Sequence, residues 1–204
     1  MHWFPVRIRA DPVTFKIRLL RKGNEMREKT DVAPKTAIRW VCRRDLDTIL
    51  QIDKQVLSAI GYWQEADWLS ILRKQNCIGM VIEYDQQIIG FMAYRLDSGF
   101  LQIIRYAILP EFQRKGCGNR LIDRMKTKLG ANNKRAALSI IVPDRLLACH
   151  LHLRSCGFTC QEILRNGWSD GSDAYLFGWD CRGIDLWPRA REVSKTSLAS
   201  DDLW

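Results

Sequence analysis

The segment 110–119 reads PEFQRKGCGN and joins an apolar run to an amphipathic one. Its two glycines, Gly116 and Gly118, stand beside side chains that carry positive charge or donate hydrogen bonds. The segment lies where a strand should end and a helix begin, so unpaired backbone N–H groups and the positive helix end would face one place. Glycine lets a ligand approach that backbone closely. The segment therefore predicts an anion-binding site.

Spacing separates this segment from two other phosphate-binding loops. A P-loop needs four residues between its first glycine and a Gly-Lys-Ser/Thr triplet, which is absent here. A dinucleotide-binding fingerprint needs a third small residue three positions after Gly118, where Leu121 stands. A solvated turn before a surface helix is the simpler alternative.

The patterns around the segment predict a mixed α/β sandwich. Helical periodicity marks helices at 46–57, 63–74, 118–130 and 146–157, with Asp45 as the N-cap of the first. Runs rich in β-formers predict strands at 37–42, 76–85, 86–96, 100–109, 135–142, 158–166 and 173–180. Short turns at 85–87 and 97–99 make three of these strands an antiparallel meander.

The spacing Gln113-Arg114-x-Gly116-x-Gly118 resembles the Q/R-x-x-G-x-G/A signature of the GNAT superfamily of N-acetyltransferases. In that family the signature cradles the pyrophosphate of acetyl-coenzyme A. The element order over 37–180 and the closing Gly-Phe of residues 157–158 are similar too. Residues 60–68 also resemble a Trp-containing stretch of RimI-like enzymes, which acetylate the N-terminal amine of a ribosomal protein. The resemblance implies the GNAT fold, a mostly antiparallel mixed sheet of about seven strands with about four helices.

The resemblance also implies a function. It predicts an acetyl-CoA-dependent N-acetyltransferase that transfers acetyl to a primary amine, foremost the N-terminal α-amine of a protein, directly in a ternary complex. The residues that match the cofactor-binding strand and loop are Tyr106, Ala107, Ile108, Gln113, Arg114, Lys115, Gly116, Cys117, Gly118 and Asn119.

Four positions depart from the RimI-like pattern. Ile141 and Pro143 stand where those enzymes have Glu and Arg on the fifth strand. Leu146 and Leu153 replace the usual Asn and Tyr. The chain therefore lacks the usual proton relay, and an alternative interpretation is a catalytically weakened GNAT domain that binds acyl-CoA as a sensor or interaction module.

Three side chains are candidate substitutes for the missing acid and base: His150, Tyr175 and Glu83. His150 precedes Leu153 by three residues on one helical face, and a histidine titrates near the pH of use. Without a base, an α-amine with a pKa of about 8 is a better acceptor than a lysine with a pKa of about 10.4.

The seven cysteines predict reduced thiols, not a disulfide framework. Cys149, His152 and Cys156 fall on one helical face and could be drawn as a zinc site, but their spacing matches no standard ligand pattern, so we expect no metal. Cys117, at a helix start in a basic loop, is expected to be an exposed, oxidisable thiol when the cofactor is absent.

Composition and charge limit the class of protein and its partners. The 204 residues are 47% hydrophobic with a net charge of +9, which predicts a globular domain that attracts anionic partners. No apolar run approaches the roughly 20 residues of a membrane span, and residues 1–13 lack a secretion signal, so we expect a cytoplasmic protein. Residues 1–36 are a basic extension, 37–180 the GNAT domain and 181–204 a tail. A ribosomal protein is one candidate partner, and nucleic acid is not expected as the direct substrate.

Overall fold

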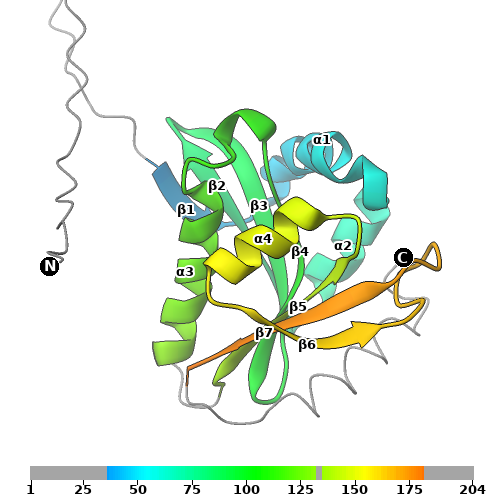
Figure 1. Ribbon diagram of the computed structural model, residues 1–204. Helices are drawn as coiled ribbons and strands as arrows, with labels where there is room; N and C mark the ends of the chain where they lie inside the picture. The colour runs from blue at the N-terminus through cyan, green and yellow to red at the C-terminus, as the bar shows by residue number, and fades with distance from the viewer. Residues whose placement is uncertain (1–35, 132–134, 182–204) are drawn as a thin grey trace, which may run out of the picture. The chain divides into compact units, whose positions relative to one another are not determined.

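Seven strands form one mixed sheet in the computed structural model, which describes residues 36–131 and 135–181 (Figure 1). Their order across the sheet is β1-β2-β3-β4-β5-β7-β6. The strands are β1 (Thr36–Trp40), β2 (Cys77–Tyr84), β3 (Gln87–Leu96), β4 (Phe100–Ile108), β5 (Ala137–Pro143), β6 (Thr159–Leu164) and β7 (Ala174–Asp180). The predicted strands and the predicted meander, β2-β3-β4, are confirmed. Apart from Thr36 and Cys181, the predicted extension and tail lie outside the described residues.

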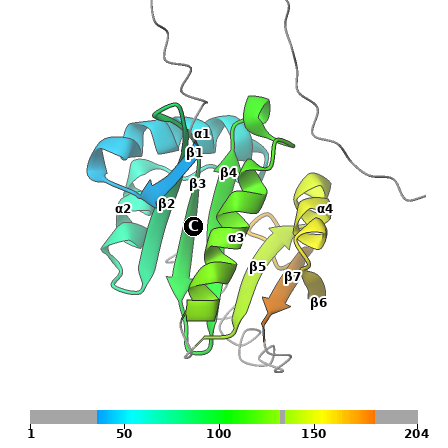
Figure 2. The ribbon, with the colours of Figure 1, turned by 90° about the vertical axis from the view of Figure 1, so that its left-hand side faces the viewer.

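Two pairs of helices cover the two faces of the sheet (Figure 2). Helices α1 (Leu46–Leu57) and α2 (Glu65–Arg73) pack on the face that we call the α1–α2 face. Helices α3 (Cys117–Ala131) and α4 (Leu147–Ser155) pack on the other, the α3–α4 face. Successive strand residues point to opposite faces, so each apolar run supplies both cores. Within the described residues, no helix combines the length and apolarity that a bilayer crossing needs.

Strands β4 and β5 are parallel and separate after a short contact. They pair at four positions, from Phe100 with Ala137 to Ile103 with Ile140. A register shift between β3 and β4 then leaves Ile104 as an extra residue, and such a β-bulge bends a strand. Beyond this point β4 continues along β3 while β5 continues along β7, so no strand among residues 36–131 and 135–181 lies beside the other edge of β4.

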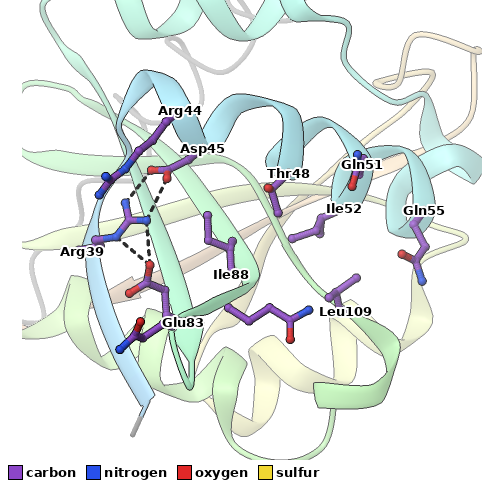
Figure 3. Close-up of a pocket in the computed structure, with 12 residues that line it drawn as sticks. Arg39, Arg44, Asp45, Thr48, Gln51, Ile52, Gln55, Glu83, Ile88 and Leu109 are labelled. Carbon is purple, nitrogen blue, oxygen red and sulfur yellow. Dashed lines mark hydrogen bonds and ion pairs between the residues drawn. The ribbon is translucent and has the colours of Figure 1, made fainter.

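The predicted capping role of Asp45 is wrong, because its carboxylate serves a different contact. Asp45 makes no capping hydrogen bond to α1. Arg39 of β1 donates to both carboxylate oxygens, at 2.6 and 2.9 Å, and the backbone N–H of Cys42 donates at 2.7 Å. Arg39 also binds Glu83 of β2 at 2.8 Å, and these side chains line one end of a cavity of about 760 Å³ between α1 and the β2–β3 turn (Figure 3). The hydrogen bonds from Arg39 lower the pKa of Asp45 to about 2, despite the opposing effect of burial.

We predict that Asp45 makes the domain lose stability in mild acid. Its pKa is lower in the folded chain than the ordinary value of 3.8, so its contribution is complete above about pH 4 and disappears as the pH falls toward 2. Between pH 5 and pH 3 the free energy of unfolding should fall by about 1 kcal/mol more in the wild type than in Asp45→Asn. Urea unfolding at several pH values measures this difference, and parallel pH curves for the two proteins would contradict the prediction.

Candidate active site

The glycine-containing loop leads directly from β4 into α3. A 3-10 turn (Pro110–Phe112) is followed by Arg114 and Gly116, with φ of 55° and 82°. A Cβ at Gly116 would meet no atom within 4 Å, so this glycine keeps both a left-handed backbone and an open space. The N–H of Arg120 donates to the carbonyl of Gly116 at 3.0 Å, which starts the helix. The remaining first-turn N–H groups and the positive helix end lie at this loop, as an anion site requires.

Gln113 stabilises the loop against the end of β4. Its side-chain amide donates to the carbonyl oxygen of Ile108 at 2.8 Å, and its backbone N–H donates to Pro110 at 3.2 Å. The Lys115 ammonium lies 5.5 Å from the centre of the Phe112 ring, and the side chains of Arg114 and Lys115 are exposed. The two cations of the segment therefore remain available to an anion.

The start of α3 is packed against α4. A Cβ at Gly118 would lie only 3.0 Å from Nε2 of His152, so a glycine permits this close approach. One turn along α4, the Cys156 thiol donates to the side-chain oxygen of Asn119 at 3.7 Å. The predicted cofactor residues of the helix start thus share one surface with His152.

Uncharged polar groups lie between β4 and α4. The Tyr106 hydroxyl and the Cys149 thiol share a hydrogen bond of 3.6 Å, and the Tyr106 and His152 rings lie 6.1 Å apart. Burial raises the pKa of Tyr106 well above 10 and that of Cys149 to about 11, and it lowers the pKa of His152. At neutral pH this wall beside the glycine loop therefore carries a phenol, a thiol and a neutral imidazole. In the described part of the chain, no group of three or more His, Cys, Asp and Glu side chains is placed to hold a metal ion.

Cys117 does not have the exposure expected from the sequence. Its side chain is buried and belongs to the α3–α4 core, together with Leu121 of the next turn. The first residue of an amphipathic helix can turn inward when its position lies on the apolar face. Position 117 does so, one turn before Leu121.

The unpaired edge of β4 starts beside the glycine loop. Tyr106, Ala107 and Ile108 pair with β3 on one side, while β5 has already separated from the other. Partly buried Phe112 and Leu146 pack against both hydrophobic cores, which places them where the two strands part. The main-chain groups on this edge can bind an extended ligand as a strand would.

Two of the apolar residues that stand at the positions of the usual proton relay, Ile141 and Leu153, lie on β5 and α4. Leu138, Ile140 and Val142 of β5 belong to the α3–α4 core, so Ile141 points to the opposite face. Ile141 is half-buried there, and no carboxylate occupies its position. Leu153 is fully buried in the core beneath α4.

Two of the three candidate acid–base residues lie together, and the third does not. The His150 and Tyr175 rings are 5.0 Å apart on the α3–α4 face, and the Nε2–H of His150 donates to the Pro143 carbonyl at 2.9 Å. Glu83 lies on β2, with β3 between it and β4, and binds Arg39 on the α1–α2 face. The cavity in Figure 3 contains Glu83 and none of the residues 110–119.

A buried ion pair beside the unpaired edge is not predicted from the sequence. Arg105 of β4 binds Asp53 of α1 through two hydrogen bonds, of 2.5 and 2.6 Å, and the two side chains are 5% and 0% exposed. The signals were an arginine inside an apolar strand and an aspartate next to the apolar Ile52 of α1. Nothing in the sequence indicates that two residues 52 positions apart meet.

Comparison with known proteins identifies the family. Residues 43–158 match the model of the acetyltransferase (GNAT) family. An N-alpha-acetyltransferase of Sulfurisphaera tokodaii is 24% identical over 169 residues, which cover 76% of this chain and 93% of the relative.

Solved structures share the fold at lower identity. The ribosomal-protein-S18-alanine N-acetyltransferase of Escherichia coli superimposes with a TM-score of 0.63 at 20% identity, covering 74% of this chain and 99% of that one. NAA60 of Arabidopsis thaliana, solved with acetyl-CoA, gives a TM-score of 0.66 at 12% identity and covers 73% of this chain and 100% of its own.

We predict that residues 118 and 152 are energetically coupled. An added methyl group at Gly118 would press on the His152 ring, which would have to move by a few tenths of an ångström to accommodate it. Gly118→Ala should therefore be more favourable for stability, by about 1 kcal/mol, in a His152→Ala background than in the wild type. Urea unfolding of the four proteins of this cycle measures the coupling, and additive effects would show that the helices do not pack as described.

Proposed function

The chain belongs to the acetyltransferase (GNAT) family and is an N-acetyltransferase, because the family model covers more than half of its residues and an N-alpha-acetyltransferase is a relative. From this premise we propose that it transfers the acetyl group of acetyl-CoA directly to the N-terminal α-amine of a protein. The observation that carries the proposal is the meeting of the α3 helix start with the unpaired edge of β4.

The residues at this meeting point fit the two parts of acetyl-CoA. The open space at Gly116 and the exposed cations Arg114 and Lys115 suit a pyrophosphate at the helix start. The β4 edge at residues 106–108 suits the amides of the pantetheine arm, which can pair with a strand. Residues 113–119 would therefore hold the phosphates, and residues 106–108 would orient the arm that carries the thioester.

The catalytic work of the chain is chiefly orientation and charge stabilisation. A main-chain N–H on the β4 edge can donate to the oxygen of the thioester carbonyl as negative charge develops on it. Holding the amine in line with the thioester carbonyl accelerates the reaction further. His150 and Tyr175 are the candidate proton donors to the leaving thiolate. Because Nε2–H of His150 is donated to Pro143, Nδ1 is the ring atom that can accept the proton lost by the attacking amine and pass it to the thiolate.

The apolar position of Ile141 favours an α-amine as acceptor. Without a carboxylate there, the chain has no base at this position to remove a proton from an ammonium group. An α-amine, with a pKa of about 8, is partly neutral at neutral pH, whereas a lysine with a pKa of about 10.4 is not. The E. coli structure is named for an alanine of a ribosomal protein as acceptor, and the S. tokodaii relative is named for N-alpha-acetylation. A ribosomal protein is therefore one candidate acceptor within this proposal.

We predict that acetyl-CoA binding depends on the open space at Gly116. Gly116→Ala should weaken binding at least tenfold in calorimetry, because its methyl group enters the proposed phosphate site. Gly171→Ala is the matched control: Gly171 has φ of 80° and also no neighbour within 4 Å, but lies in the β6–β7 turn. Equal loss in both variants would assign the effect to backbone strain and contradict the phosphate site.

The same proteins test transfer. Free thiol should be released from acetyl-CoA with peptides that have a free N-terminus, and not with the same peptides blocked by a formyl group. Binding without release for any amine would instead support the acyl-CoA sensor.

We predict a pH dependence set by the acceptor. With no base at position 141, kcat/KM for the peptide should rise about tenfold per pH unit below pH 8 and level off above it, as the α-amine becomes neutral. Initial rates of thiol release from pH 6 to 10 measure this profile. A rise that continues to pH 10 would indicate a lysine acceptor.

A further inference from the structure

The buried pair Arg105–Asp53 holds more than its own two side chains. Nη2 of Arg105 also donates to the carbonyl oxygen of Gly61 at 2.6 Å, and its guanidinium lies 4.8 Å from the centre of the Trp63 ring. Oδ1 of Asp53 accepts a hydrogen bond of 3.1 Å from the backbone N–H of Trp63. All of these partners lie in residues 58–64, which we call the α1–α2 loop. The pair therefore fixes this loop to β4.

The α1–α2 loop has a second attachment on the other side of β5. The indole N–H of Trp168, in the turn between β6 and β7, donates to the carbonyl oxygen of Ile60 at 3.4 Å. In the sheet, β5 lies between β4 and β7. The loop thus reaches from β4 to the β6–β7 turn on the α1–α2 face, the face toward which Ile141 of β5 points.

This location is where an amine would approach. The proposed cofactor site lies at the start of α3, so an acceptor that reaches the thioester from the opposite side of the gap meets the α1–α2 loop and the β6–β7 turn. Arg105 follows Ile103, the last β4 residue paired with β5, by two positions and precedes Tyr106, the first residue of the proposed thioester-binding edge. A shift of Arg105 would therefore change the distance between the α1–α2 loop and that edge.

We propose that the Arg105–Asp53 pair is a positioning device that sets the α1–α2 loop as the acceptor-binding side of the active site. The inference rests on the proposed transferase function. A buried ion pair contributes little net stability, because desolvation offsets most of its attraction, and apolar residues of similar size can replace such a pair without loss. Apolar residues cannot, however, make the hydrogen bonds to Gly61 and Trp63. Placement of the loop is therefore the property that the charges provide.

The test replaces both charges at once. The double variant Asp53→Leu with Arg105→Met leaves no unpaired buried charge, so it should fold with an unchanged melting temperature. Its KM for an N-terminal peptide should rise at least tenfold, while its Kd for acetyl-CoA changes less than twofold. Deuterium exchange of the backbone amides of residues 58–64 should become faster. Arg105→Lys keeps the charge but not the planar fork, so it should give an intermediate KM.

A second ion pair between a strand and α1 provides the matched control. Arg39 binds Asp45 just before α1, and both side chains line the cavity in Figure 3; in the described part of the chain, the residues lining this cavity include none of the α1–α2 loop. Asp45→Leu with Arg39→Met should leave the peptide KM unchanged.

The outcomes separate this inference from the proposed function. A folded Asp53→Leu, Arg105→Met variant with unchanged peptide KM would overturn the positioning role alone. Failure of that variant to fold, or equal losses of peptide and acetyl-CoA binding, would assign the pair a purely structural role and overturn it too. No peptide-dependent thiol release by the wild type would overturn both.

Discussion

The separation of β4 from β5 is the constraint on which the rest of the domain depends. The two strands are parallel, so a crossover has to connect them, and α3 is the helix of that crossover. Four paired positions join the strands into one sheet, and the bulge at Ile104 then turns β4 away. Because α3 begins soon after β4 ends, its N-terminus lies at the open end of the gap. An anion site and an unpaired strand edge are thereby brought together by connectivity.

The two sides of this gap differ in their electrostatics. On the α3–α4 face, burial raises the pKa of Tyr106 and of Cys149 and lowers the pKa of His152. All three side chains are therefore favoured in their neutral forms. On the α1–α2 face, a buried arginine and a buried aspartate bind each other through two hydrogen bonds. Because these three side chains are neutral, the negative charge of a cofactor would be bound by the glycine loop and the start of α3 instead. A charged pair, in contrast, provides directed bonds that hold a loop in one place.

The chemistry proposed for the site follows from what the gap contains. Main-chain groups do not depend on side-chain identity, so the apolar residues Ile141 and Leu153 leave the strand edge intact. They remove the side chains that would move protons. The acceptor that needs least help is then an amine already neutral near the pH of use. A member of the acetyltransferase family can therefore have apolar residues at the proton-relay positions, provided that its acceptor amine is already neutral.

The sequence by itself determined the helices, the strands and the glycine loop. Periodicity of two and of 3.6 is local, and the glycine spacing of residues 113–118 lies within six positions, so both could be read along the chain. Tertiary structure alone decided which distant residues meet: Arg105 with Asp53, Trp168 with Ile60, and His152 with Gly118. It also turned Cys117 inward, engaged Asp45 with Arg39 and kept Glu83 on the far side of β3. The physical reason is that side-chain contacts depend on the register and packing of whole elements, which no single stretch of sequence contains.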